Sequence, residues 1–137
     1  MKQTQLILKN DITEIGKIYL FLKKLSAEWN LSKELIFELN LVLEECIVNI
    51  IRYGYTDNKT HKIKIEFRRN DKTVSMLIED DGIAFNILEE PPTGEHGKSV
   101  EKRKIGGLGI HFIKSLVDHI NYKREDGLNK LILIKKS

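Results

Sequence analysis

The spacing of the apolar residues changes from helical to alternating near residue 60, and this change most constrains the fold. Before it, apolar residues recur every three or four positions in two successive stretches, as they do on one face of an α-helix. After it, Ile63, Ile65 and Phe67 alternate with charged residues, which is typical of a half-buried β-strand. A chain with both periods in this order is expected to pack helices against a sheet.

Two helices are predicted in the first half of the chain. Asn10 or Asp11 is suited to cap the first helix, with Glu14 placed for a capping box, and the helical pattern runs to about residue 29. Ser32 is a suitable N-cap for the second helix, which is expected to end near Gly54. The apolar stripe of this second helix consists of Leu35, Leu39, Val42, Cys46 and Ile50.

The remaining segments predict a sheet and one further helix. Turns are expected at Asn70–Asp71 and Asp126–Gly127, and the further helix should begin at the glycine-rich segment 106–109. Strands are expected at residues 3–9, 63–67, 74–78, about 119–124 and 130–135. The order predicts an α+β fold, a two-layer sandwich of a largely antiparallel mixed sheet with helices on one face.

Composition narrows the class of protein. A length of 137 residues suits a single domain, 1–137, with 41% hydrophobic and 31% charged residues. The one cysteine, Cys46, cannot form a disulfide framework, which favours a reducing cytoplasm. No segment has the roughly 18 apolar residues of a spanning helix, so we expect neither membrane insertion nor secretion. The 23 basic and 20 acidic residues nearly balance, so direct nucleic-acid binding is not expected.

A polar stripe lies opposite the apolar one on the second predicted helix. Glu38, Glu45, Asn49 and Arg52 are spaced by seven, four and three residues, which projects them along one side. A carboxylate can accept the proton of a hydroxyl group, and an amide oxygen can bind Mg²⁺. The alternative is an ordinary solvated helix face, which the stripe taken alone favours.

Two further segments have the composition of ligand-binding loops. Asp80 ends a predicted strand, and Gly82 allows a tight turn toward a ligand, although a simple strand-ending turn has the same composition. Gly106, Gly107 and Gly109 precede a helix, where free N–H groups can bind phosphate. The alternative is a sharp entry into that helix, although three glycines in four residues exceed what a turn requires.

Two other patterns are set aside. Residues 94–99 end like a Walker A loop, but Pro92 stands where that loop requires its first glycine. The four histidines, at positions 61, 96, 111 and 119, lack the spacing of a helical zinc pair and have no cysteine partners. We interpret them as ordinary surface or core histidines.

Taken in chain order, three segments resemble the N, G1 and G2 boxes of the GHKL ATPases. They are Glu45-x-x-x-Asn49 with Gly54-Tyr55, then Asp80-x-Gly82-x-Ala84-Phe85, then Gly106-Gly107-Leu108-Gly109. The resemblance covers roughly residues 1–135 and is closest to the anti-sigma-factor serine/threonine kinases. Three features depart from the pattern. Tyr53 replaces a histidine of many relatives, Ala84 replaces the second G1 glycine, and residues 131–134 lack a threonine common in the family's last nucleotide contact.

The resemblance implies a role for each matching residue, with ATP and Mg²⁺ as cofactors. Glu45 corresponds to the general base, Asn49 to the Mg²⁺ ligand and Asp80 to the adenine-binding aspartate. Residues 86–105 correspond to the ATP lid, in which Arg103 or Lys104 can reach the γ-phosphate or a protein substrate. The other implied nucleotide contacts are Gly82, Ala84 in place of the second G1 glycine, Gly106, Gly107, Leu108 and Gly109.

The leading hypothesis is therefore a kinase that phosphorylates a serine of an anti-anti-sigma (STAS) protein and, in alternation, sequesters a sigma factor. The family also implies a homodimer. A second hypothesis is a non-catalytic regulator in which the nucleotide switches a protein-binding surface. A third is a nucleic-acid-binding domain, motivated by Lys62, Lys64, Arg68 and Arg69, although a solvated strand face is the favoured interpretation of these residues.

Overall fold

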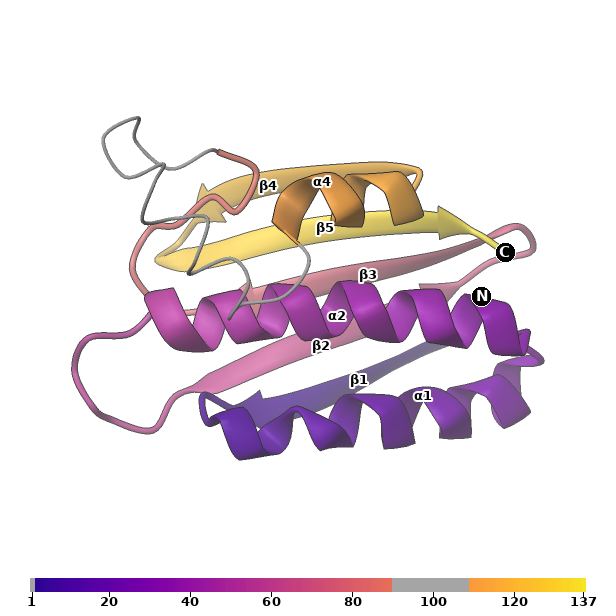
Figure 1. Cartoon of the computed structure of the whole chain (residues 1–137), viewed down its shortest axis with the longest axis horizontal. Helices are drawn as coiled ribbons and strands as arrows, with labels where there is room; N and C mark the ends of the chain where they lie inside the picture. The colour runs from indigo at the N-terminus through magenta and orange to yellow at the C-terminus, as the bar shows by residue number, and fades with distance from the viewer. Residues whose placement is uncertain (1, 90–108) are drawn as a thin grey trace.

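The computed structural model describes residues 2–89 and 109–137, and all structural statements below refer to these residues. Within them the strands form one sheet in the order β1-β2-β3-β5-β4, and every neighbouring pair is antiparallel. Helices α1, α2 and α4 all cover the same face of this sheet (Figure 1). The predicted α+β sandwich with helices on one face is confirmed. The elements are β1 (Lys2–Lys9), the 3-10 turn η1 (Ile12–Glu14), α1 (Gly16–Trp29), α2 (Lys33–Tyr53), β2 (Lys62–Arg69), β3 (Thr73–Asp80), α4 (Gly109–Leu116), β4 (His119–Glu125) and β5 (Leu128–Lys136).

The start of α2 follows the prediction, whereas the start of α1 differs from it. Ser32 Oγ accepts a hydrogen bond from Leu35 N at 3.1 Å, which is the expected N-cap. Asp11 caps the 3-10 turn η1 instead of α1, which begins only at Gly16. The capping box was wrong, because Glu14 Oε1 accepts from the backbone N–H of Lys9 at 2.9 Å. This bond ties the tight first turn back to the end of β1.

The core lies between the sheet and the helices. The alternation of β2 places Ile63, Ile65 and Phe67 inside with no exposed surface, as predicted. On α2, Leu39 and Leu43 are equally buried and complete the apolar side of the helix. Each such side chain contributes roughly 1.5–3 kcal/mol of hydrophobic free energy. This rigid core fixes the orientation of α2 against the strands that carry the polar residues.

Three chain segments from distant parts of the sequence meet at one end of the molecule. The last turns of α2, the end of β3 and the beginning of β5 all lie at the left in Figure 1. The end of β3 pairs directly with the beginning of β5, at Asp80 and Asn129. None of the described helices combines the length and apolar character needed to cross a membrane.

Candidate functional site

Asp80 is a buried carboxylate at the end of β3. Only 4% of its surface is exposed, and Oδ1 accepts two hydrogen bonds of 2.9 Å, from Gly82 N and from Asn129 Nδ2. Burial raises the pKa of Asp80, whereas the two hydrogen bonds act in the opposite direction by favouring the charged form. These donors fix the orientation of the carboxylate.

Asn129 is a site residue that the sequence analysis missed. It is 5% exposed, and its Nδ2 donates to Asp80 Oδ1 at 2.9 Å and to the carbonyl of Ile83 at 2.7 Å. Its Oδ1 accepts from Phe85 N at 3.2 Å and from the hydroxyl of Tyr122. The side-chain amide of Asn129 therefore connects β5 to the end of β3, to the turn after it and to β4. The sequence signal that could have indicated Asn129 is a polar residue at the start of a largely apolar strand. It was missed because this strand was predicted to start one residue later, at residue 130.

Gly82 packs against the end of α2 in a way that excludes a side chain. The carbonyl of Gly54 accepts from Ile83 N at 2.8 Å, so the two backbones lie in direct contact. A Cβ at Gly82 would lie 2.4 Å from that same carbonyl oxygen, which is far closer than real Cβ contacts. Arg124 Nη1 also donates to the carbonyl of Gly82 at 2.8 Å. The glycine predicted from its motif thus has a local steric reason.

A small cavity lies next to Asp80. Its volume of about 20 Å³ is enough for a single water molecule. Its walls are mostly apolar, and Asp80, Asn129 and Tyr122 are the lining residues with polar side-chain groups. A planar base of purine size therefore requires side chains of the wall to shift. The lining residues are Cys46, Ile50, Ile78, Asp80, Phe85, Ile87, Tyr122, Asn129 and Leu131.

Glu45 and Asn49 lie one turn apart on α2 and contact each other. Asn49 Nδ2 donates to the Glu45 carbonyl at 2.8 Å and to Glu45 Oε1 at 3.2 Å. Oε1 of Glu45 also accepts from Gly109 N, the first residue of α4, at 3.0 Å. Glu45 is only 7% exposed, so the solvated-face interpretation is wrong for this residue.

The other two members of the polar stripe lie apart from this pair. Glu38 Oε1 lies 3.6 Å from Lys135 Nζ of β5. Arg52 is exposed near the end of α2. The structure therefore divides the predicted stripe: Glu45 contacts the start of α4, and Asn49 contacts Glu45.

The structure describes only some of the remaining predicted site residues. Ala84 is exposed in the turn after β3, and the part of the predicted lid at residues 86–89 forms a turn in which Glu89 N donates to the carbonyl of Asn86. The rest of the predicted lid lies outside the described residues. The same is true of Arg103, Lys104, Gly106, Gly107 and Leu108.

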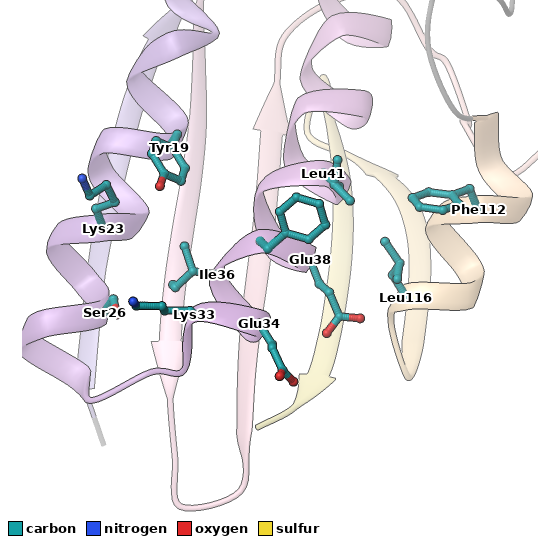
Figure 2. Close-up of a pocket in the computed structure, with 11 residues that line it drawn as sticks. Tyr19, Lys23, Ser26, Lys33, Glu34, Ile36, Glu38, Leu41, Phe112 and Leu116 are labelled. Atoms are coloured by element: carbon teal, nitrogen blue, oxygen red, sulfur yellow. The ribbon is translucent and has the colours of Figure 1, made fainter.

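A groove of about 990 Å³ lies on the outer side of the helices. Figure 2 shows Tyr19 and Lys23 of α1, Glu38 of α2 and Phe112 of α4 around it. Glu45, Asn49 and Asp80 do not line this groove. It is therefore separate from the polar residues described above.

Two of the four basic residues of β2 are paired with acidic neighbours. Lys64 Nζ lies 3.0 Å from Glu79 Oε1, and Arg68 Nη2 lies 2.8 Å from Glu66 Oε1. Pairing of this kind reduces the local positive potential that nucleic-acid binding needs. The geometry supports the solvated strand face rather than a nucleic-acid interface.

Comparison with known proteins gives a consistent assignment. The family model described as "Histidine kinase-like ATPase domain" matches residues 8–135. The serine-protein kinase RsbW of Listeria innocua is 24% identical over 128 residues, covering 91% of this chain and 80% of the relative. RsbW of Oceanobacillus iheyensis is 27% identical over 125 residues, covering 89% and 78%. The serine/threonine-protein kinase BtrW of Bordetella bronchiseptica is 29% identical over 108 residues, covering 77% and 74%.

A solved structure shows the same fold. The crystal structure of the RsbU and RsbW domains of a Mycobacterium tuberculosis protein superimposes with a TM-score of 0.69 at 14% identity. The superposition covers 98% of this chain and 32% of that longer chain. With the family match spanning almost the whole sequence, the chain belongs to the histidine kinase-like ATPase domain family, as its three sequence boxes predicted.

Proposed function

We propose that this protein is an ATP-dependent serine/threonine-protein kinase that phosphorylates an anti-anti-sigma (STAS) protein and, in alternation, binds a sigma factor. The observation that carries the proposal is the buried, fixed carboxylate of Asp80, which lines the same small cavity as Cys46, the residue that directly follows Glu45 of the Glu45–Asn49 pair. The relatives named above are serine- or serine/threonine-protein kinases. Their names favour the kinase over the non-catalytic regulator.

The surroundings of Asp80 fit an adenine base. Oδ1 holds the donors from Gly82 and Asn129, and the second carboxylate oxygen is the acceptor that we assign to the exocyclic amine of adenine. The apolar walls of the adjacent cavity suit the faces of a purine. Because the cavity holds about 20 Å³, binding requires Phe85 and Ile87 to move outward. Both residues follow β3 in the segment that includes Ala84, which we assign to the same base contact.

The residues at the start of α4 fit the phosphates. Gly109 N–H lies at the beginning of a helix, and we assign phosphate binding to it together with Gly106, Gly107 and Leu108. Arg103 of the proposed lid, residues 86–105, is assigned to the γ-phosphate or the protein substrate.

Asn49 is the residue that we assign to Mg²⁺. Its Nδ2 donates to two oxygens of Glu45, which directs the amide oxygen of Asn49 away from Glu45. An amide oxygen is one of the ligand types that Mg²⁺ binds. Among the described residues, no three His, Cys, Asp or Glu side chains are placed to hold a metal. A site with one protein ligand and phosphate oxygens matches the preference of Mg²⁺. Bound Mg·ATP supplies the transferable phosphoryl group and the charge neutralisation for its transfer.

Glu45 is the residue that we assign as general base. Its carboxylate is buried, and it can accept the hydroxyl proton of a substrate serine once that hydroxyl is within hydrogen-bond reach. In the described structure Oε1 accepts from Gly109 N–H. Exchange of this bond for one to phosphate removes one donor from Oε1 and supplies a phosphate donor at the same time.

The proposal extends to organisation and location. We assign the whole chain, 1–137, to one ATP-binding domain, place it in the cytoplasm and expect a homodimer, as in the family. The decisive experiment mixes the protein with STAS proteins of the same organism and labelled Mg·ATP. Transfer of label to a serine is the expected result. Tight ATP binding without transfer to any STAS protein would favour the non-catalytic regulator instead.

A further inference from the structure

His61 bridges two carboxylates in the loop between α2 and β2. Its Nε2 lies 2.8 Å from Asp57 Oδ2, and its Nδ1 lies 3.1 Å from Asp81 Oδ1. Carboxylate oxygens only accept hydrogen bonds, so contact at both ring nitrogens requires a proton on each. The geometry is therefore that of an imidazolium ion, which was not foreseen when this histidine was interpreted as an ordinary one.

Asp81 connects this bridge to the nucleotide site. It directly follows Asp80, and the next residues form the turn whose Ile83 N–H donates to the carbonyl of Gly54. On the other side, Tyr55 follows Gly54, stacks on the His61 ring at 4.5 Å and donates its hydroxyl to Asp81 Oδ1 at 3.4 Å. The segment 54–61 and the turn 80–83 are thus joined by three separate contacts.

The backbone of His61 is itself held in place. Its N–H donates to Asn10 Oδ1 at 2.8 Å, and Asn10 N–H donates to the His61 carbonyl at 3.1 Å. The imidazole side chain is 19% exposed, compared with 51% for Asp81. A fixed ring between two carboxylates can restrain the turn on which Asp80 and Gly82 lie.

We propose that His61 is a positioning residue for nucleotide binding, whose imidazolium holds the turn 80–83 against the end of α2 through Asp81. The inference rests on the proposed function of the Asp80 site. Loss of the ring proton removes at least one of the two bridging hydrogen bonds. The turn then has fewer restraints, and ordering it on nucleotide binding costs more conformational entropy.

The carboxylates around His61 shift its pKa in the direction that favours the protonated ring. The hydrogen bonds to Asp57 and then to Asp81 raise the pKa of His61, and partial desolvation opposes them. The Tyr55 ring also stacks on His61, and burial raises the pKa of Tyr55 so that its hydroxyl stays neutral. A histidine whose pKa is higher in the folded state stabilises the fold at pH values below its unfolded-state pKa of about 6.5. That contribution is lost as pH rises through the folded-state pKa.

The test compares nucleotide affinity of the wild type and His61→Gln between about pH 5.5 and 8.5. The probe is Mg·ADP, and the ratio of the two affinities at each pH cancels the titration of the nucleotide phosphates. We expect the wild type to bind about fivefold more tightly at the acidic end, with the ratio approaching one at the basic end. His119→Gln, an exposed histidine of β4, is the matched control and should keep the wild-type profile.

A second variant separates positioning from simple structural support. Asp57→Asn keeps the size of the side chain and removes one carboxylate, so the pKa of His61 should fall and the affinity profile should move to lower pH. An NMR titration of the His61 ring measures that pKa directly. A flat ratio for His61→Gln, with nucleotide still bound, overturns the positioning role alone. Absence of Mg·ADP binding by the wild type at every pH overturns the proposed function as well.

Discussion

The carboxylate of Glu45 accepts a hydrogen bond from the backbone N–H of Gly109 at 3.0 Å, across a separation of 64 residues. This bond joins α2 to the first residue of α4. It also pairs the proposed general base with a proposed phosphate donor, and Asn49 Nδ2 donates to the same Glu45 oxygen. Binding of phosphate at Gly109 and release of Glu45 for catalysis are therefore expected to be a single exchange.

Glu45→Ala should abolish phosphoryl transfer and preserve nucleotide binding. Removal of a general base lowers the rate by about 10²- to 10⁴-fold, while the Gly109 N–H becomes available to phosphate. The measurement is label transfer from ATP to the STAS partner, with ADP affinity determined in parallel. Glu44→Ala removes the neighbouring carboxylate, whose contact is with Asn40, and should transfer normally. Normal transfer by Glu45→Ala would show that the base lies elsewhere.

Asp80→Asn should remove nucleotide binding without destabilising the free protein. The amide oxygen can still accept from Gly82 and Asn129, and the cost of burying a charge disappears. Toward the base, however, the new NH₂ group would meet the exocyclic amine of adenine as donor against donor. Mg·ADP at about 100 times its Kd raises the apparent free energy of unfolding of the wild type by about 2.7 kcal/mol. Thermal melts with and without Mg·ADP should show this increment for the wild type only; equal increments would contradict the base assignment.

Asn129→Ala should cost both stability and affinity. The substitution removes the hydrogen bonds from Asn129 to the buried Asp80 carboxylate, the Ile83 carbonyl and the Phe85 N–H. We expect a loss of about 3 kcal/mol in the free energy of unfolding, measured by urea denaturation, and weaker ADP binding. Asn129→Thr retains a short hydroxyl donor, so its loss should be smaller. A neutral Asn129→Ala would mean that the buried groups find other partners.

Gly82→Ala tests the contact between the turn and the end of α2. The added methyl would lie 2.4 Å from the Gly54 carbonyl oxygen, a backbone atom that a local side-chain shift cannot move. We expect a loss of about 1–3 kcal/mol in unfolding free energy together with weaker nucleotide binding. Gly16→Ala is the control, because a Cβ there meets nothing within 4 Å and the residue opens α1. That variant should be neutral or stabilised by less than about 1 kcal/mol.

Much of the fold follows from local patterns in the sequence. The alternation in residues 63–67 and the Ser32 cap are local features, and both are found where they were predicted. The first helix shows the limit of such reasoning. Asp11 and Glu14 are correctly spaced for a capping box, but the carboxylate of Glu14 bonds to Lys9 because the end of β1 is brought beside it.

The candidate site, like the fold, was predicted only in part from the sequence. The box residues Glu45, Asn49, Asp80 and Gly82 were proposed from the resemblance of their segments to the family's boxes, and the structure brings Glu45 and Asn49 into contact. Spacing did not indicate that Glu45 is buried while Glu38, on the same predicted stripe, pairs with Lys135. Burial depends on which neighbouring element covers a helix face. Here the beginning of α4 covers only one part of the stripe.

The sequence by itself determined the elements and the chemistry available to them, because periodicity, caps and turns act between residues a few positions apart. Only the tertiary structure decided which groups share a hydrogen bond. Pairing of β3 with β5 places Asn129 beside Asp80, and the turn after β3 brings Asp81 to His61. Neither contact has a local signal, since each depends on the strand register and the packing of α2 against a sheet assembled from both ends of the chain.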